Sequence, residues 1–278
     1  MFETRKIEIG SPSIVASVQT DPGCVREANE DSGRHISPND PDLQARRGSL
    51  TVVADGMGGH ASGEVASQMA VELITELYYA DNGLAAPDAL RNAVEIANQQ
   101  IFAASQTSEE YAGMGTTVIA LVVKDGRAFS AHVGDSRLYR FRNRVLEMLT
   151  LDHSQVMEMV KHGVLTMEQA RNHEDKNVIL RAVGTQEAVE VEVSEGFDVV
   201  TGDTFLLCSD GLSDMLDDTE IEAILQRGGD QHSLCEALIA AAKTSGGHDN
   251  ITVGLVGIAD GVPAASAAVR VTRDIEVR

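Results

Sequence analysis

Four aspartates stand at the ends of apolar segments with small residues beside them. Asp55 follows the run Leu-Thr-Val-Val-Ala, Asp135 follows Ala-His-Val-Gly, Asp210 follows Leu-Leu-Cys-Ser, and Asp249 precedes the apolar segment 251–258. One such aspartate is by default a turn residue, because Asp-Gly is a favoured turn dipeptide. Four at strand ends are hard to assign to independent turns. If they converge, their mutual repulsion requires cations, and all-oxygen ligands favour Mg²⁺ or Mn²⁺ over zinc.

A short charged segment near the start of the chain could bind a phosphate group. Arg26 is followed closely by the carboxylates of Glu30 and Asp31. A guanidinium can donate to two phosphate oxygens at once, which a lysine cannot do. Taken alone, a solvated charged turn is the plainer interpretation of this segment.

Covalent catalysis has no good candidate in this sequence. A cysteine phosphatase needs an arginine at a fixed spacing after its cysteine, and those positions hold Glu30, Asp214 and Ala241. A phosphate-binding P-loop needs Gly-Lys, and no lysine here follows a glycine. The serine elbow motif Gly-x-Ser-x-Gly is also missing. Water activated by metal ions is therefore the chemistry that the sequence favours.

The charge balance argues against nucleic acid and membrane partners. The 278 residues carry 43 acidic and 22 basic side chains, a formal net charge of −21. Such a chain repels DNA, RNA and anionic membranes at long range. No stretch reaches the roughly 18 apolar residues of a membrane span, and no apolar leader follows the N-terminus. The three cysteines form no C-x-x-C pair, so we expect reduced, buried thiols in a cytoplasmic protein.

Short strands rich in Val, Ile, Leu and Thr dominate the chain. Because many of them follow one another directly, we expect largely antiparallel sheets with helices outside. The expected strands span residues 13–20, 50–54, 117–123, 128–133, 137–141, 204–209 and 251–258.

Amphipathic helices are expected between these strands. In the first, apolar residues recur every four positions and predict one buried face, at 65, 69, 73 and 77. The second begins at Pro87, with an apolar stripe at 90, 94, 97 and 101. Two later helices are expected to open with capping boxes, at Thr219 with Glu222 and at Ser233 with Glu236. Residues 34–48 are expected to form a surface loop.

Six motifs, taken together and in order, resemble the metal-dependent protein phosphatase family (PPM, the protein phosphatase 2C class) in its bacterial form. Each motif alone is weak, whereas six in order are specific. The resemblance runs from about residue 13 to 258. The motifs are Arg26-x-x-Asn29-Glu30-Asp31, Asp55-Gly56-Met57-Gly58-Gly59, Gly115-Thr116-Thr117, Val133-Gly134-Asp135-Ser136-Arg137, Ser209-Asp210-Gly211 and Gly247-His248-Asp249-Asn250.

The resemblance implies an α+β fold. It would be a four-layer α-β-β-α sandwich with two central antiparallel sheets and a dinuclear metal site at one end. Residues 1–260 would form the catalytic domain, with a flap subdomain at about 150–184. Residues 261–278 would be a C-terminal tail or an added edge strand.

The resemblance also assigns metal ligands by position. Asp55 would bridge two Mn²⁺ or Mg²⁺ ions, with the Gly56 carbonyl beside it. Asp210 and Asp249 would complete this site, and Asp135 with Asp210 would hold a weaker third ion.

The remaining roles concern substrate and water. Arg26 would hold the substrate phosphate, and Glu30 and Asp31 would orient metal-bound waters. Many eukaryotic members have His where this chain has Met57, and that His is proposed to protonate the leaving alkoxide. His60 is a candidate replacement, and a surface turn residue is an equally good interpretation of it.

The sequence therefore predicts a monomeric Ser/Thr protein phosphatase that opposes a bacterial eukaryotic-like Ser/Thr kinase. Metal-activated water would attack phosphorus in one in-line step, without a phosphoenzyme. Two alternatives stay open. One is a non-catalytic regulatory module on the same scaffold, and the other is a phosphatase of small metabolites.

Overall fold

The computed structural model describes residues 13–58, 62–80 and 83–260. Its strands form two sheets, and the strand pairings among the described residues are all antiparallel. The first sheet has the order β1-β12-β11-β7-β8. Its strands are β1 (Ser13–Asp21), β12 (Ile251–Ala259), β11 (Thr204–Cys208), β7 (Arg137–Arg142) and β8 (Val145–Met148).

The second sheet has the order β10-β6-β5-β3-β2, with β4 paired to β3 and β9 paired to β6. Its strands are β10 (Phe197–Asp198), β6 (Arg127–Val133), β5 (Val118–Lys124), β3 (Ser49–Met57), β2 (Asp31–Ile36), β4 (Gly115–Thr116) and β9 (Glu192–Val193).

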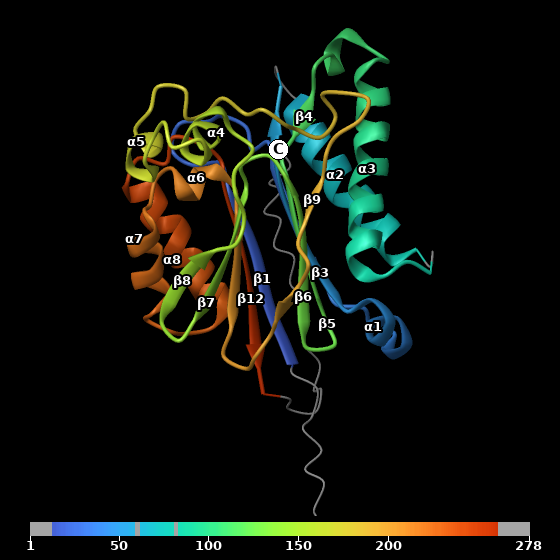
Figure 1. Cartoon of the computed structure of the whole chain (residues 1–278), viewed down its shortest axis with the longest axis vertical. Coiled ribbons are helices and arrows are strands. Elements are labelled where there is room, and N and C mark those ends of the chain that lie inside the picture. The colour runs from blue at the N-terminus through green and yellow to red at the C-terminus, as the bar shows by residue number, and fades with distance from the viewer. Residues whose placement is uncertain (1–12, 59–61, 81–82, 261–278) are drawn as a thin grey trace, which may run out of the picture.

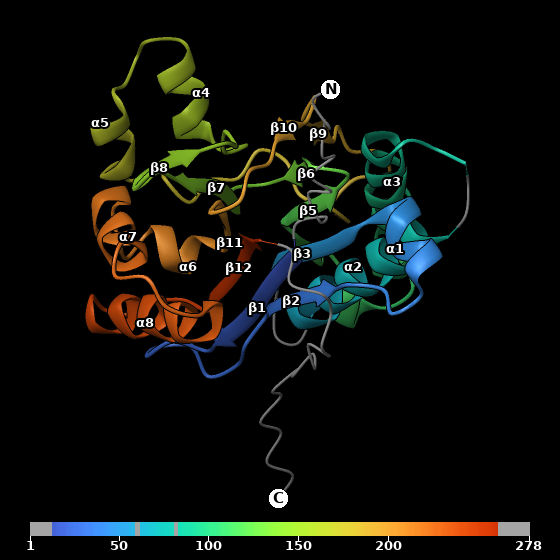
Figure 2. The same cartoon turned by 90° about the horizontal axis from the view of Figure 1, so that it is seen from below.

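Helices cover the outer face of each sheet, so that the molecule has four layers (Figures 1 and 2). Helices α2 (Ser62–Tyr79) and α3 (Ala86–Ser105) pack on the second sheet, and α6 (Asp210–Ser213), α7 (Asp218–Leu225) and α8 (Gln231–Thr244) on the first. The other helices are α1 (Pro41–Arg47), α4 (Gln155–Lys161), α5 (Met167–Arg171) and the 3₁₀ turn Glu109–Tyr111. The predicted α-β-β-α sandwich is confirmed.

The core divides into three apolar clusters, one in each space between layers. Strand β3 shows why: Leu50, Val52 and Ala54 face α2 and α3, while Val53 faces the other sheet. Successive side chains of a strand point to opposite faces. A strand buried on both faces is therefore apolar throughout, and this is why β3 was readily predicted.

Several predictions about local structure were wrong. The predicted loop 34–48 contains the end of β2 and all of α1, whose N-cap Asp40 accepts from the N–H of Asp42. The predicted face of α2 (65, 69, 73 and 77) packs against the core but is only partly buried. The deeply buried residues, which include Ala66, Ala70 and Ile74, show that the buried face is displaced by one position.

The predicted capping residues were also wrong for the two later helices. Asp217 forms the capping box of α7 with Glu220, and Asp230 caps α8. The caps are instead carboxylates two residues before Thr219 and three residues before Ser233, and these accept from the first N–H groups of the two helices.

Within the described ranges, no helix is long and apolar enough to cross a bilayer. Residues 261–278, predicted as a tail or an edge strand, lie outside the described part of the chain.

Candidate metal centre

The predicted aspartates lie at one common end of the two sheets. Asp31 is the register partner of Asp55 in the pairing of β2 with β3. Asp135 follows the C-terminal end of β6, which pairs with the start of β5. Asp210 and Asp249 flank the paired ends of β11 and β12. Antiparallel pairing thus brings together carboxylates that are up to 218 positions apart, from Asp31 to Asp249.

Several oxygens in this cluster are buried without a partner. Among the described residues, Oδ1 of Asp31, Asp135 and Asp210 has no hydrogen-bond donor. The other oxygen of Asp31, Oδ2, accepts from Ser209 Oγ at 2.7 Å. An unsatisfied buried carboxylate oxygen is costly, so these three atoms indicate a missing positive partner.

The electrostatics of the cluster point the same way. Burial raises the pKa of Asp31 to about 6 and that of Asp135 to about 7. Burial also raises the pKa of Asp55, and the charges of Asp31, Asp210, Asp135 and Asp249 add to the shift. The pKa of Asp210 is raised by burial and then by Asp135 and Asp214. Without cations the carboxylates repel one another.

Cations nearby do not neutralise the cluster. Arg26 Nη2 pairs with Asp249 Oδ2 at 2.7 Å, on the exposed side of the site. Lys176 pairs with Asp214 at 2.6 Å. Arg137 lowers the pKa of Asp135 but is itself paired with Asp152 at 2.7 Å. The buried carboxylates of Asp31, Asp135 and Asp210 form no ion pair with a described cationic side chain, and such an all-oxygen group fits Mg²⁺ or Mn²⁺.

The backbone around Asp55 is fixed on both sides. The N–H of Asp55 donates to Thr117 Oγ1 at 3.0 Å, and its carbonyl accepts from Thr117 N–H at 2.8 Å. Gly56 must be glycine because a Cβ there would lie 2.1 Å from the carbonyl oxygen of Gly63 in α2. The predicted carbonyl ligand therefore sits where strand and helix meet without side chains between them.

Asn250 is a residue of the site to which the sequence reasoning assigned no role. It is 5% exposed, and its Nδ2 donates to the carbonyls of Pro22 and Ala28 at 3.1 and 2.9 Å. Its Oδ1 accepts from Glu30 N–H at 2.8 Å. One amide side chain therefore holds the loop that carries Arg26. The signal in the sequence that could have identified Asn250 is its position between Asp249 and the strand that begins at Ile251.

We expect Asn250→Ala to destabilise the protein by at least about 2 kcal/mol, because each buried group left unpaired costs about 1–3 kcal/mol. Urea denaturation in the presence of Mn²⁺ measures this. Asn172→Ala is the control, because Asn172 is exposed at the end of α5, and it should change stability by less than about 0.5 kcal/mol. Equal effects of the two variants would contradict the anchoring role.

The predicted flap lies beside the aspartates. A groove of about 350 Å³ is lined by Asp135 and Asp210 and, from the segment 150–184, by residues that include Met157, Met167 and Arg171. One expectation about the cysteines was wrong, because Cys24 is exposed and only Cys208 and Cys235 are buried thiols. His60 lies outside the described residues, so its role stays a prediction.

A four-layer sandwich with unpartnered buried carboxylates at one end fits a protein that binds metal ions there, and comparison with known proteins identifies its family. The profile of the protein phosphatase 2C family matches residues 37–244. Serine/threonine phosphatase stp of Listeria monocytogenes is 39% identical over 245 residues, which are 87% of this chain and 94% of that protein.

Solved structures agree. The serine/threonine phosphatase PstP/Ppp of Mycobacterium tuberculosis superposes with a TM-score of 0.78 and 34% identity, over 88% of this chain and 99% of that one. A PstP catalytic domain in complex with two manganese ions superposes with a TM-score of 0.76 and 33% identity, over 90% and 100%. The chain belongs to the protein phosphatase 2C family and is an enzyme of the serine/threonine phosphatase class.

Proposed function

We propose that this chain hydrolyses phosphoserine and phosphothreonine in proteins, with two Mn²⁺ or Mg²⁺ ions at the aspartate centre. The observation that carries the proposal is the set of buried carboxylate oxygens without partners, at the end of a protein phosphatase 2C sandwich. The names of the relatives support the substrate class, and the manganese-bound PstP supports the metal.

In this proposal Asp55, the Gly56 carbonyl, Asp210 and Asp249 hold the two ions, and Asp135 with Asp210 holds a weaker third. When bound, such ions lower the pKa of a water molecule and offset charge on the phosphoryl oxygens. The family resemblance and the unsatisfied oxygens both select Asp135 and Asp210 as ligands, and the third unsatisfied oxygen belongs to Asp31, which the resemblance assigns to metal-bound water. A catalytic role is therefore favoured over a regulatory module without activity.

The other residues orient water and substrate. Glu30 is half-buried, and burial raises the pKa of its carboxyl group against the opposing effect of Arg26. Glu30 and Asp31 therefore supply oxygen acceptors for water at the edge of the cluster. Arg26 is half-exposed beside Asp249, where its guanidinium can donate to a phosphate that approaches from solvent.

We expect Arg26→Ala to lower kcat/KM for phosphopeptides by one to two decades while Mn²⁺ binding is retained. A lost charged contact is worth about 1.5–3 kcal/mol. Arg26→Lys should recover only part of the lost kcat/KM, because an ammonium group cannot donate to two phosphate oxygens in the bidentate geometry of a guanidinium. Arg34→Ala serves as the control, since Arg34 is exposed on β2. Wild-type kinetics in Arg26→Ala would show that Arg26 is only a surface charge.

The substrate class is tested with Mn²⁺ and two panels, phosphoserine and phosphothreonine peptides against phosphorylated sugars. Preference for sugars would favour the small-molecule alternative. No turnover even of p-nitrophenyl phosphate would favour the non-catalytic module. His60 remains a prediction as the acid for the leaving group, with water held at the metals as its alternative.

We further propose that a monomer of this chain acts in the cytoplasm and opposes a eukaryotic-like Ser/Thr kinase. Bacterial relatives named serine/threonine phosphatase stp and protein phosphatase PhpP support this role. Phosphoproteomics on a strain that carries Asp210→Asn would reveal the substrates as phosphosites that rise. An unchanged set of phosphosites would contradict the role.

A further inference from the structure

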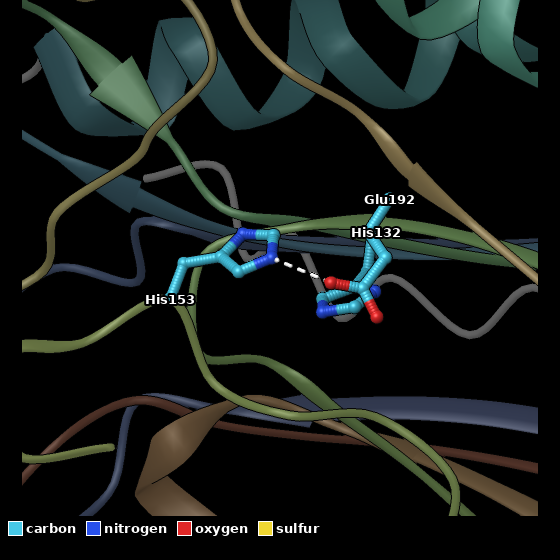
Figure 3. Close-up of side chains that lie close together, drawn as sticks. All are labelled: His132, His153 and Glu192. Atoms are coloured by element: carbon cyan, nitrogen blue, oxygen red, sulfur yellow. Dashed lines mark hydrogen bonds and ion pairs between the residues drawn. The ribbon is translucent and has the colours of Figure 1, made fainter. Parts of the chain in front are cut away.

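Two buried histidines and a glutamate lie close together (Figure 3), and one of them hydrogen-bonds to Gly134, the residue before Asp135. They are His132 in β6, His153 just before α4 and Glu192 in β9, and one ligand atom of each lies within 4.8 Å of the others. No role in the proposed mechanism falls to any of them. Their side-chain types suggest a zinc site at first sight.

The orientation of the rings argues against a metal between them. The two imidazoles are stacked, with centroids 4.5 Å apart and an angle of 18° between their planes. The lone pair of an imidazole nitrogen lies in the plane of its ring. Two stacked, nearly parallel rings therefore direct their lone pairs side by side and not toward one ion.

The hydrogen bonds of His153 lead to the same conclusion. Its Nδ1 accepts from the N–H of Gly134 at 3.1 Å, so in the neutral ring the proton is on Nε2. Nε2 then donates to Glu192 Oε2 at 3.3 Å. Arg181 Nη1 also lies 3.4 Å from Nε2, but a guanidinium only donates, so that contact is not a hydrogen bond in this tautomer. A protonated nitrogen is not a metal ligand.

His153 holds in place the turn that carries Asp135, instead of a metal ion. Besides the bond to Nδ1, the carbonyl of Gly134 accepts from His153 N–H at 2.9 Å. Gly134 has a φ of 106°, and a Cβ there would lie 2.7 Å from Thr117. The turn is thus fixed by Thr117 on one side and by His153 on the other. Asp135 is the next residue, and its Oδ1 is one of the unpartnered oxygens.

His153 also joins this turn to the base of the flap. Its carbonyl accepts from Leu180 N–H at 2.7 Å. The neighbouring residues Ser154 and Ile179 form a β-bridge, which closes the segment between them. One residue therefore connects both ends of the flap to the turn that presents Asp135.

His132 keeps the ring of His153 in place. It is 3% exposed, stacks on the ring of His153, and its Nε2 donates to the carbonyl of Leu151 at 3.1 Å. Burial lowers the pKa of both histidines. Both rings are then neutral at neutral pH, and the lone pair of His153 Nδ1 remains available to Gly134.

We propose that His153 is a positioning residue for the third metal ion: its Nδ1 fixes the Gly134 amide and thereby the carboxylate of Asp135. The proposal rests on the proposed function, because the third site is part of it. Partners behind a metal ligand are typically worth 10–100-fold in metal affinity. We expect an effect of that size on the weakest Mn²⁺ site and none on the two tighter sites.

Two substitutions separate the hydrogen bond from packing. In His153→Asn the side-chain oxygen can take the place of Nδ1 and accept from Gly134. In His153→Gln the amide lies near the position of Nε2, and the acceptor for Gly134 is lost. Calorimetric titration with Mn²⁺, which needs no substrate, should show the weakest site 10–100-fold weaker in His153→Gln. The same site should be within about threefold of wild type in His153→Asn, the rescue that a purely structural role would not give.

Asp135→Ala is the benchmark, because it should abolish the weakest site. A normal weakest site in Asp135→Ala would overturn the third site and this proposal together. The weakest Mn²⁺ site could be lost in Asp135→Ala while its affinity in the two His153 variants is either unchanged or weakened equally. That result would overturn the role of His153 alone. If His153→Gln does not fold, His132→Leu gives the second test, with a smaller weakening of the same site expected. An unchanged site in His132→Leu would then overturn the proposal.

Discussion

Asp210→Asn will lower kcat/KM for phosphopeptides by about 10³-fold or more. Asp210 follows β11, and its Oδ1 is buried without a partner in the described part of the chain. The amide keeps the shape of the side chain but brings no negative charge to a cation. Metal ions contribute several kcal/mol to catalysis, and each 1.36 kcal/mol is a factor of ten.

The matched control is Asp230→Asn, the same change at the exposed N-cap of α8, where Asn caps as well as Asp. Its kinetics should equal those of wild type. Melting curves in chelator check that Asp210→Asn is folded. Activity of the folded Asp210→Asn variant within tenfold of wild type would contradict the assignment of this residue to the metal centre.

The sequence predicts well those strands that appear in it as a continuous apolar run. Strands such as β5 and β12 are buried on both faces and are therefore apolar along most of their length, with Lys124 at the end of β5 and Thr252 in β12 as exceptions. Strand β2 was missed because Asp-Ser-Gly-Arg-His-Ile has no apolar run and lies at the edge of its sheet. An edge strand has one side that is not paired, and charged side chains are common on it, so it shows no apolar signal.

The candidate site was predictable only where its residues come soon after an apolar run. Asp55 lies inside β3, which continues to Met57, and Asp210 is the first residue of α6, but each comes soon after an apolar run that the sequence displays. Asn250 and His153 act instead through partners that are distant in sequence, such as Glu30 for Asn250. Nothing in their immediate neighbours indicates those partners. The face of α2 was misplaced for a similar reason, since small residues such as Ala66 and Ala70 fit closest to the sheet.

Mn²⁺ will stabilise the folded protein strongly, because it relieves the repulsion among the carboxylates. A ligand that binds only the folded state at a hundredfold excess over its Kd adds about 2.7 kcal/mol. For a chain of this size that corresponds to a rise in Tm of roughly 5–10 °C. Melting curves with chelator and with Mn²⁺ at pH 8 measure the rise. Unchanged midpoints would contradict the cluster.

In chelator, Asp135→Asn will be more stable than wild type at pH 8, and its advantage will shrink toward pH 5. The pKa of Asp135 is about 7 in the folded protein, against about 3.9 in an unfolded chain. Between these values the folded state binds more protons than the unfolded state, so wild-type stability falls as pH rises through this window. The loss is complete above pH 7, and Asn, which cannot ionise, avoids it.

Comparing the variant with wild type isolates the carboxylate from other titrating groups. Buried His35, for example, has its pKa lowered to about 4 by burial, and it therefore destabilises the folded protein at low pH in both proteins equally. With saturating Mn²⁺ at pH 8, wild type should become the more stable of the two proteins. The reason is that Asp135→Asn has one carboxylate fewer to bind the cation. A difference between the two proteins that is independent of pH in chelator would mean that Asp135 ionises in the folded state as it does in water. The unpartnered oxygen at Asp135 would then carry no repulsion for a cation to relieve.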